Sequence, residues 1–324
     1  MKILVTGAGA LLGQGIIRSL KKSSLSDLKV IAADPSPLSA GLYWTDERYL
    51  LPKASDPFFI EGLIHVIKLS KPDLIIPGTD VELMILALNK QKLEVEYGVK
   101  VLVSDPRVIE IADDKYKTFE FFRDNGFTPP ESCLPGDEKQ LIEKVGFPLI
   151  VKPRNGARSI GVCKVNTLEE LNGAIRTTQR PVIQECVGHD DVEYTAGALY
   201  FDGECNATIV MRRDLRDGNT YRAYVEKSIE LNEQVNCFAR KLMPFGPVNF
   251  QFRLCNGNVK VFEINGRFSG TTPLRMHAGF NEVEMCVRYL LCGEPIKKPE
   301  ISQITILRHW SETIVTKDTM PPKK

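Results

Sequence analysis

Apolar and polar residues alternate along the first hundred positions in a pattern typical of strands that alternate with helices. Short apolar runs at residues 2–6, 29–34, 73–78 and 99–104 are separated by amphipathic segments at 13–22, 56–70 and 80–96. Runs that are apolar throughout belong to strands buried on both faces. This part of the chain therefore predicts a parallel sheet that is covered by helices on both sides.

The pattern changes after residue 110. A helix that contains Lys115 ends near residues 125–126, and a small mixed unit follows at residues 147–186. From residue 191 onward the chain predicts mainly strands, at 192–200, 204–213, 221–229, 248–255 and 259–265, with helices at 232–243 and 281–293. The second half is therefore expected to form an antiparallel sheet, and the tail at 318–324 is expected to be loose.

The segment "VNFQFRLCNGNVKVFEINGRFSG" (residues 248–270) carries the most chemistry. Its two alternating runs flank Asn-Gly, which is a strong hairpin signal. A two-residue loop would mix polar and apolar side chains on each face. A loop of residues 256–258 separates them. That loop pairs Gln251 with Glu263, Asn249 with Asn265, Phe250 with Ile264 and Phe252 with Phe262.

The polar face of this hairpin predicts a magnesium site. It brings the Glu263 carboxylate close to the amide oxygens of Gln251 and Asn265. Mg²⁺ prefers such oxygens, with one or two carboxylates beside the oxygens of a phosphate. Arg267, on the turn that follows, is suited to bind a phosphate. The alternative is an ordinary solvated sheet face.

Two neighbouring segments fit a bound polyphosphate. Lys152 ends a strand before a loop rich in glycine and serine, whose backbone N–H groups could cover phosphates, although an ordinary turn would look the same. The segment at residues 181–197 crosses between two strands and could offer backbone groups to a nucleobase. Glu193 could bind ribose hydroxyls, or could simply be solvated.

Taken in order, these segments resemble the ATP-grasp superfamily, and most of all the single-copy relatives of the carbamoyl phosphate synthase large subunit. The motifs are "DKYKTFEFFRDNGFTPPES", "FPLIVKPRNGARSIGV", "VIQECVGHDDVEYT" and "VNFQFRL…VFEINGRFSG". The resemblance implies an α/β protein with the ATP-grasp fold: a Rossmann-like N-terminal domain, a small α+β central lobe and a larger C-terminal antiparallel-sheet lobe. The corresponding boundaries are 1–112, 113–187, 188–300 and, for a final strand and tail, 301–324.

The resemblance also implies an activity and a set of site residues. The activity is ATP-dependent joining of a carboxylate to an amine (or thiol) through an acyl phosphate, with Mg²⁺ or Mn²⁺. ATP phosphates would be bound by Lys115 and Lys152 with the loop around Ser159, adenine by Glu185 and Val187, and ribose by Glu193. The metal would be held by Gln251, Glu263 and Asn265, and the transferred phosphate by Arg267. Ala157 and Arg158 depart from the family, because this loop usually holds more glycine.

Several further residues are candidates for the substrate pocket. Arg212 and Arg213 end a strand near the expected phosphates, and only one of them can point inward because strand side chains alternate. We favour Arg213 as the one that binds the carboxylate or acyl phosphate. Ser269, Gly270 and Thr271 could line the same pocket. Asp80, after a parallel strand near Glu82, is either a substrate ligand or a helix cap.

The glycine turn "VTGAGALLGQG" raises a different hypothesis. A dinucleotide site requires Gly-x-Gly-x-x-Gly, but Gly7 and Gly9 are followed by Leu12 at the third position, with Gly13 one residue late. Asp34 lies where a ribose-binding acid is expected. An NAD(P)-dependent reductase is therefore one alternative function, and an ATP-binding protein without catalytic activity is another.

Composition narrows the choice of partners. The chain of 324 residues has a formal net charge of +1, which favours neither nucleic acid nor a membrane surface as a partner. No apolar run is long enough to span a membrane and no signal peptide is evident, which predicts a cytoplasmic protein. The eight cysteines are scattered and predict reduced thiols rather than a zinc site. Small-molecule substrates are expected, and the resemblance allows a homodimer.

Overall fold

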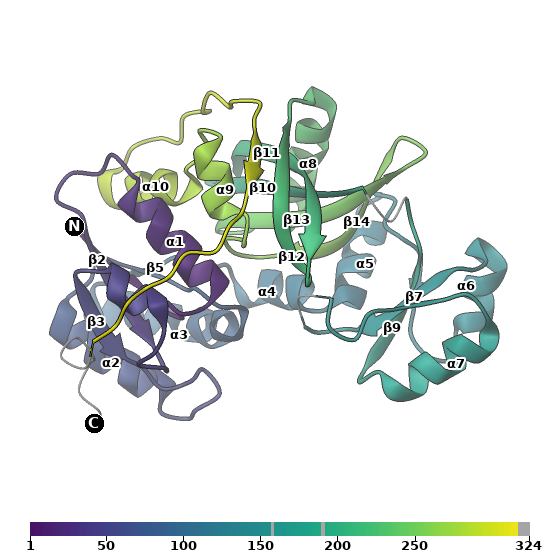
Figure 1. Ribbon diagram of the computed structural model, residues 1–324, viewed down its shortest axis with the longest axis horizontal. Helices are drawn as coiled ribbons and strands as arrows, with labels where there is room; N and C mark the ends of the chain where they lie inside the picture. The colour runs from purple at the N-terminus through teal and green to yellow at the C-terminus, as the bar shows by residue number, and fades with distance from the viewer. Residues whose placement is uncertain (157–158, 189–191, 317–324) are drawn as a thin grey trace.

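The computed structural model describes residues 1–156, 159–188 and 192–316 and arranges them around three sheets (Figure 1). The first sheet is parallel, with the order β3-β2-β1-β4-β5. Its strands are β1 (Lys2–Val5), β2 (Lys29–Asp34), β3 (Glu47–Leu50), β4 (Leu74–Ile76) and β5 (Lys100–Val101). The helical segments between them are α1 (Leu11–Lys21), η1 (Ala40–Trp44), α2 (Phe59–Ser70), η2 (Asp80–Glu82) and α3 (Leu83–Tyr97).

Alternation along β1 explains why this sheet is buried on both faces. Ile3 and Val5 point into a core that includes α1, whereas Leu4 points into a second core with α2 and α3. These three side chains are completely buried, so both faces of the strand are apolar after Lys2. The predicted parallel sheet between helices is therefore confirmed.

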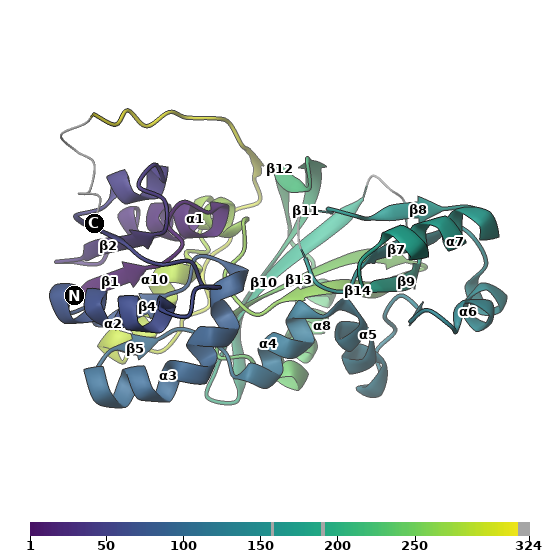
Figure 2. The same ribbon diagram turned by 90° about the horizontal axis from the view of Figure 1, so that it is seen from below.

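The second sheet forms a small lobe with the order β6-β9-β7-β8. Its strands are β6 (Ser132–Cys133), β7 (Leu149–Pro153), β8 (Cys163–Val165) and β9 (Pro181–Glu185), with helices α6 (Glu138–Val145) and α7 (Leu168–Thr177). Two helices, α4 (Pro106–Asp113) and α5 (Lys115–Asp124), lie between the first sheet and this lobe in the sequence. Figure 2 shows the lobe standing apart from the first sheet, at the opposite end of the molecule.

The third sheet is antiparallel, with the order β14-β13-β10-β11-β12-β15. Its strands are β10 (Glu193–Phe201), β11 (Glu204–Arg216), β12 (Asn219–Glu226), β13 (Gly246–Cys255), β14 (Asn258–Asn265) and β15 (Thr305–Leu307). The associated helical segments are α8 (Ile229–Leu242), α9 (Thr272–His277), α10 (Glu282–Val287) and η3 (Arg288–Cys292). After β15, residues 308–316 cross in front of α1 (Figure 1); we refer to residues 305–316 as the C-terminal strap.

The two faces of this sheet differ in polarity. Ala196 and Ala198 of β10 pack into a core with α8, on one face. On the other face, Leu199 and Phe201 join the core that contains α1 and α10, while Glu193 lies at the far end of the same strand. One face therefore changes from apolar to polar along its length, and the polar end is the part that carries the candidate site.

The hairpin differs from the sequence prediction in its turn. The loop has two residues, Asn256 and Gly257, with φ values of 50° and 77°, and Cys255 pairs with Asn258. The predicted pairs of Gln251 with Glu263 and of Asn249 with Asn265 are present, but Phe252 pairs with Val261 and not with Phe262. The register shifts between Gln251 and Phe252, because a bulge adds one residue to β14. This bulge explains how the predicted pairs next to Gln251 can be present although the loop is one residue shorter than predicted.

Candidate active site

The polar end of the β13–β14 hairpin has the arrangement that the sequence predicted. The Glu263 carboxylate accepts hydrogen bonds from Gln251 Nε2 and Asn265 Nδ2, each at 3.2 Å. Arg267 Nη2 donates to Asn265 Oδ1 at 2.8 Å. The three proposed metal ligands and the proposed phosphate ligand therefore form one connected group.

This group continues across the sheet through charged side chains. Arg213 Nη2 donates to Gln251 Oε1 at 2.6 Å, and Arg213 Nε donates to Glu193 Oε1 at 3.0 Å. Arg253 pairs with Glu193 at 3.4 Å and donates to the Val187 carbonyl at 3.3 Å. Glu193, placed by the resemblance at a ribose, thus lies between two arginines.

The two adjacent arginines of β11 point to opposite faces. Arg213 is 9% exposed and lies on the polar face of the sheet, beside Glu193 and Gln251. Arg212 lies on the other side, with Asp214 at 3.4 Å and its guanidinium 3.8 Å from the centre of the Tyr224 ring. Arg213 is therefore the member of the pair that reaches the site.

Lys152 faces the hairpin from the small lobe. Its ammonium group donates to Gln184 Oε1 at 2.8 Å and lies 5.5 Å from the centre of the Phe262 ring. Burial, reinforced by the positive charge of Lys115, lowers the pKa of Lys152 to about 7. A buried cation that lacks a carboxylate contact is stabilised by an anion, so this position suits a phosphate.

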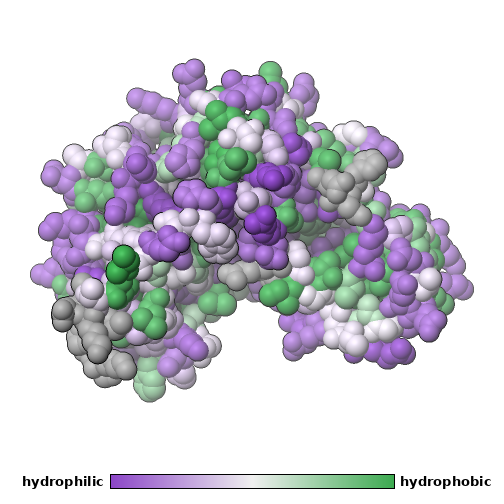
Figure 3. Space-filling model, in the orientation of Figure 1, coloured by the Kyte–Doolittle hydropathy of each residue, from purple (hydrophilic) through white to green (hydrophobic). Residues whose placement is uncertain are grey.

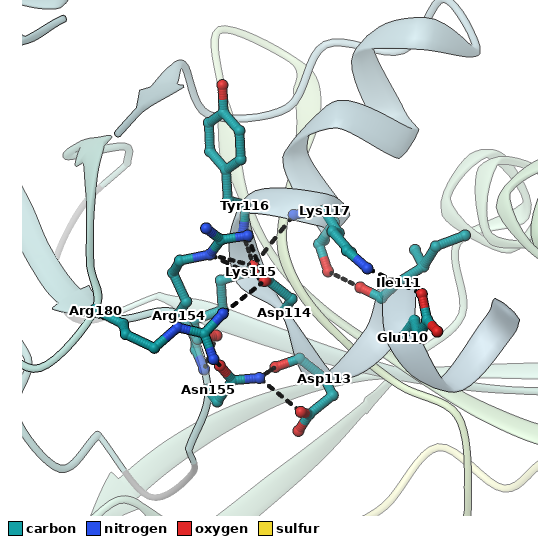
Figure 4. A network of polar contacts seen from close by, with 11 residues as sticks. Glu110, Ile111, Asp113, Asp114, Lys115, Tyr116, Lys117, Arg154, Asn155 and Arg180 are labelled. Atoms are coloured by element: carbon teal, nitrogen blue, oxygen red, sulfur yellow. Dashed lines mark hydrogen bonds and ion pairs between the residues drawn. The ribbon is translucent and has the colours of Figure 1, made fainter. Parts of the chain in front are cut away.

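Lys115 is held in place by the start of its own helix (Figure 4). Asp114 caps α5 by accepting the Tyr116 and Lys117 N–H groups. Asp114 also accepts two hydrogen bonds from Arg154 Nε, at 2.9 and 3.0 Å, and these bonds join α5 to the end of β7. The Lys115 ammonium donates to the Gly156 carbonyl at 2.8 Å, so the lysine stands at the edge of the loop that follows Lys152.

The remaining predicted nucleotide residues lie at the junction of the two lobes. The Glu185 carboxylate accepts from Lys260 Nζ at 2.8 Å and from the Glu131 N–H at 3.0 Å. Ser159 has a φ of 55° and accepts a backbone hydrogen bond from Val162 at 3.3 Å in a turn. Ala157 and Arg158, where the sequence departs from the family, lie outside the described residues, so nothing is concluded about them.

The donor set at the hairpin fits a magnesium ion that is shared with a nucleotide. No group of three or more histidine, cysteine, aspartate or glutamate side chains that could hold a metal occurs within the described residues. One carboxylate with two amides cannot saturate a divalent cation, and Mg²⁺ takes its other ligands from phosphates and water. The amide groups of Gln251 and Asn265 now direct their N–H toward Glu263, and each would turn its oxygen inward to bind a cation.

Asp80 does not cap a helix, which corrects one of its two predicted alternatives. Its carboxylate accepts from Arg267 Nε at 2.7 Å and Nη2 at 2.9 Å, and this contact lowers its pKa despite the opposing effect of burial. The pair joins the carboxyl end of the first sheet to the hairpin. Ser269 and Thr271 bond to each other and to the backbone that precedes α9, and both are buried.

The glycine turn of the first sheet is filled by the protein itself. Asp34 accepts the Gly9 N–H at 2.7 Å, the Ser36 N–H at 2.9 Å and the Ser39 hydroxyl at 2.6 Å. A Cβ atom on Gly9 would lie 2.2 Å from the Ser39 Oγ. The carboxylate that would bind the ribose of NAD therefore already has three internal partners, and a neighbouring serine occupies the space.

Comparison with known proteins identifies the fold. Residues 3–102 match the model of the PylC-like N-terminal domain, residues 115–241 that of the D-ala D-ala ligase C-terminus, and residues 189–313 that of ATP-grasp in the biosynthetic pathway with Ter operon. The N5-carboxyaminoimidazole synthetase of Staphylococcus aureus complexed with ADP superposes with a TM-score of 0.73 and 19% identity, over 93% of this chain and 79% of the other. The L-amino acid ligase of Bacillus licheniformis gives 0.70 and 17%, over 91% and 75%. The chain has the ATP-grasp fold.

Curated sequences point in the same direction. The carbamoyl phosphate synthase large chain of Caldanaerobacter subterraneus is 26% identical over 92% of this chain, and that of Methanosarcina barkeri is 24% identical over 84%. This chain spans only 29% and 28% of those two relatives. The predicted resemblance to the ATP-grasp superfamily is confirmed, and the alternative of an NAD(P)-dependent reductase receives no support.

Besides Arg253, Lys260 and Arg154, three further residues of the site were missed by the sequence analysis. Gln184, one residue before Glu185, contacts Lys152, and Phe262, the extra residue at the bulge, lies beside the same ammonium group. Asp114 anchors Arg154, and its position directly before a predicted helix is a capping signal that could have revealed it. The other two depend on strand register, which no local signal indicated.

Proposed function

We propose that this protein is an ATP-dependent ligase that joins a carboxylate to an amine, or to a thiol, through an acyl phosphate, with release of ADP and phosphate. The observation that carries the proposal is the juxtaposition of Glu263, Gln251 and Asn265 with the buried ammonium group of Lys152. The ATP-grasp fold, shared with a synthetase solved in complex with ADP, supports it. The proposal keeps the predicted division of the chain at residues 112, 187 and 300.

The reaction needs charge neutralisation more than it needs a nucleophilic side chain. A carboxylate is a poor electrophile, and phosphorylation of one oxygen supplies a leaving group that the amine then displaces. Lys115, Lys152 and Arg267 would bind phosphate oxygens, and Arg213 would bind the substrate carboxylate. Mg²⁺ or Mn²⁺ held by Gln251, Glu263 and Asn265 would neutralise charge on the triphosphate.

The polar face provides more positive than negative charge for this purpose. Arg213 and Arg253 pair with Glu193, Arg267 pairs with Asp80, and Glu263 is the one further acid of this face that the proposal uses, whereas Lys115 and Lys152 add two further cations. Binding of a nucleotide and a carboxylate would exchange some of these internal ion pairs for contacts to ligands. Because the guanidinium groups are already held by neighbours, little reorganisation is needed at the moment of reaction.

The nucleotide positions follow the resemblance. Glu185 and Val187 would meet adenine through the backbone, Ser159 would lie over the phosphates, and Glu193 would bind ribose hydroxyls after release from Arg213 or Arg253.

No helix of the described residues has the length and apolar character that a membrane crossing requires. A cytoplasmic location, small-molecule substrates and a homodimer complete the proposal.

A screen of ADP release tests the function directly. Purified protein would be incubated with Mg-ATP and pairs of amino acids and small carboxylic acids, and products would be identified by mass spectrometry. The proposal expects ADP release that needs both an acid and an amine. ADP release without any dependence on a second substrate would instead indicate the non-catalytic alternative, and stabilisation by NADH but not by Mg-ATP would overturn nucleotide binding at the hairpin.

A further inference from the structure

A cavity beneath the C-terminal strap has no assigned ligand. It has a volume of about 470 Å³ and is formed by α1, Trp44, α9 and residues 306–313. Small-molecule sites usually occupy about 300–1,000 Å³ and combine an apolar wall with a few polar groups. Trp44, Pro273 and Ile306 provide apolar surface here. The cavity therefore has the size and the lining of a site for a small organic molecule.

The charge of the cavity is strongly positive. Its lining includes Arg18, Lys21, Lys22 and Arg308, together with His277 and His309, and Glu312 is the one acid among the described lining residues. The two arginines and two lysines of this lining form no ion pair with any residue in the described part of the chain. The protein as a whole carries a net charge of only +1, so this local excess of positive charge is not a general property of the surface.

Arg308 is the residue that most clearly needs an anion. It is mostly buried, and its guanidinium donates to two backbone carbonyls, those of Thr220 at 3.0 Å and of Gly270. Burial lowers its pKa, and the charge of Arg18 lowers it further. Two cations that face one cavity without a carboxylate between them repel each other, and a bound anion would remove that cost.

Hydrogen bonds connect the cavity to the candidate active site. Thr220 accepts from both sides, since its carbonyl bonds to Arg308 and its hydroxyl accepts from Arg213 Nη1 at 3.3 Å. Gly270, the other partner of Arg308, follows Arg267 by three residues in the turn after β14. A ligand in the cavity is thus separated by one short loop from the groups proposed to bind the acyl phosphate.

We propose that this cavity binds a carboxylate or phosphate group of one organic substrate of the ligase, remote from the reacting atom of that substrate. The substrate then carries an anionic group in addition to the group that reacts, which distinguishes it from a simple amine or a simple monocarboxylic acid. Arg308 and Arg18 bind the anionic group, and Trp44, whose ring lies 4.8 Å from the Arg18 guanidinium, holds that arginine in place and forms part of the apolar wall. That the bound anion belongs to a substrate rests on the proposed ligase function. Binding of an anion in the cavity can be measured independently of that function.

Binding is tested with defined probes on the full chain. Glutarate and inorganic phosphate would be titrated by calorimetry at constant ionic strength, with neutral glutaramide for comparison. The double variant Arg18→Gln/Lys21→Gln removes two exposed cations of the cavity, and Arg240→Gln/Lys241→Gln removes two exposed cations from the end of α8 as a matched control. We expect the cavity variant to weaken anion binding by about tenfold or more and the control to leave it unchanged.

The outcomes separate this inference from the proposed function. Preference for glutarate over phosphate indicates a carboxylate ligand, and the reverse preference indicates a phosphorylated one. The inference would be overturned if both double variants weakened the binding of the probes equally. It would also be overturned if sodium chloride gave the same titration signal as the probes. Glu263→Gln should leave unchanged the part of the probe binding that the cavity variant removes, so a failed ligase assay does not affect this result.

The substrate role requires a second measurement. With any anionic substrate that the ADP-release screen identifies, the cavity variant should raise KM by about tenfold and leave kcat within about twofold, because only binding remote from the reacting atom is lost. An unchanged KM would show that the cavity does not serve the substrate. Arg308→Gln is the less informative variant, because its guanidinium also holds the Gly270 loop.

Discussion

The glycine turn after β1 and the polar face of the β13–β14 hairpin both resemble nucleotide sites, but their polar groups differ in whether a ligand could replace their internal partners. At the turn, Asp34 uses its oxygens on Gly9, Ser36 and Ser39, so this carboxylate is not free to receive a ligand. At the hairpin, Glu263 accepts from two amide groups at 3.2 Å, and the oxygens of these amides accept from Arg213 and Arg267, so a bound cation and nucleotide would replace these contacts. A motif indicates a site only where its polar groups can exchange their partners for a ligand.

The two regions also differ in what surrounds them. Gly78, beside the turn, has no room for a side chain, since a Cβ atom there would lie 2.2 Å from the Thr6 carbonyl oxygen and 2.7 Å from Gly13 Cα. The hairpin instead faces a second lobe that carries two buried lysines. The glycines at the turn therefore serve close packing of the backbone, and the hairpin is the region to which we assign the proposed chemistry.

The largest expected effect comes from Glu263→Gln. The substitution keeps the shape but removes the one carboxylate of the metal set, so the rate of ADP release should fall by about 100- to 1,000-fold. Glu204→Gln, at the exposed turn between β10 and β11, is the matched control and should release ADP at the parent rate. A Glu263→Gln protein that releases ADP normally would show that the assigned metal role is wrong.

Gly78→Ala should instead reduce stability. The new methyl group meets backbone atoms, which cannot move aside as a side chain can, so the free energy of unfolding should fall by about 3 kcal/mol. Gly173→Ala in α7 is the control, because no atom beyond its neighbours in the same helix lies within 4 Å of its Cβ position, and it should stabilise by about 0.5–1 kcal/mol. Urea denaturation measures both changes. A Gly78→Ala protein that kept its stability but lost nucleotide binding would contradict this assignment, because it would indicate that the turn binds the nucleotide.

The pKa of Lys152 predicts a pH dependence of intermediate size. Because its pKa of about 7 lies below that of a free lysine, the unfolded chain binds more protons than the folded one above pH 7, and this residue makes stability rise with pH up to about 10.4. A phosphate prefers the protonated lysine, so affinity for Mg-AMP-PNP should fall by up to about tenfold per pH unit above 7. Calorimetry on Lys152→Met should show a flatter profile, and identical profiles for the two proteins would contradict the assignment.

Asp80→Asn should give the smallest effect. Asp80 is 43% exposed on its side chain, so its ion pair with Arg267 contributes less than about 1 kcal/mol to stability. Because Arg267 is proposed to bind phosphate oxygens, its release from a carboxylate should nevertheless change KM for Mg-ATP by about two- to fivefold, with kcat little altered. Steady-state kinetics would detect this change, and a loss of kcat as large as that of Glu263→Gln would show that Asp80 acts in the chemical step.

Most of the fold could be predicted from local pattern, because buried strands and amphipathic helices each leave a period in the sequence. The pairing of Gln251 with Glu263 could also be predicted, since only one register separates polar from apolar side chains near those residues. The bulge at Phe262 could not, because an extra residue on one strand changes pairing without changing composition. Strand alternation predicts that Arg212 and Arg213 point to opposite faces, and the contact of Arg213 with Glu193 in the structure shows which of them lies on the polar face.

The sequence by itself determined the strands, the helices and the residues able to bind phosphate and metal, because these depend on side-chain chemistry and on periods of a few residues. Only the tertiary structure decided which polar groups already have partners. Asp34 and Asp80 look equally available in the sequence, yet Asp34 closes its own turn and Asp80 meets an arginine 187 residues away. The cation-lined cavity likewise joins α1 to a strap from the end of the chain, and contacts between such distant segments depend on how the whole chain packs.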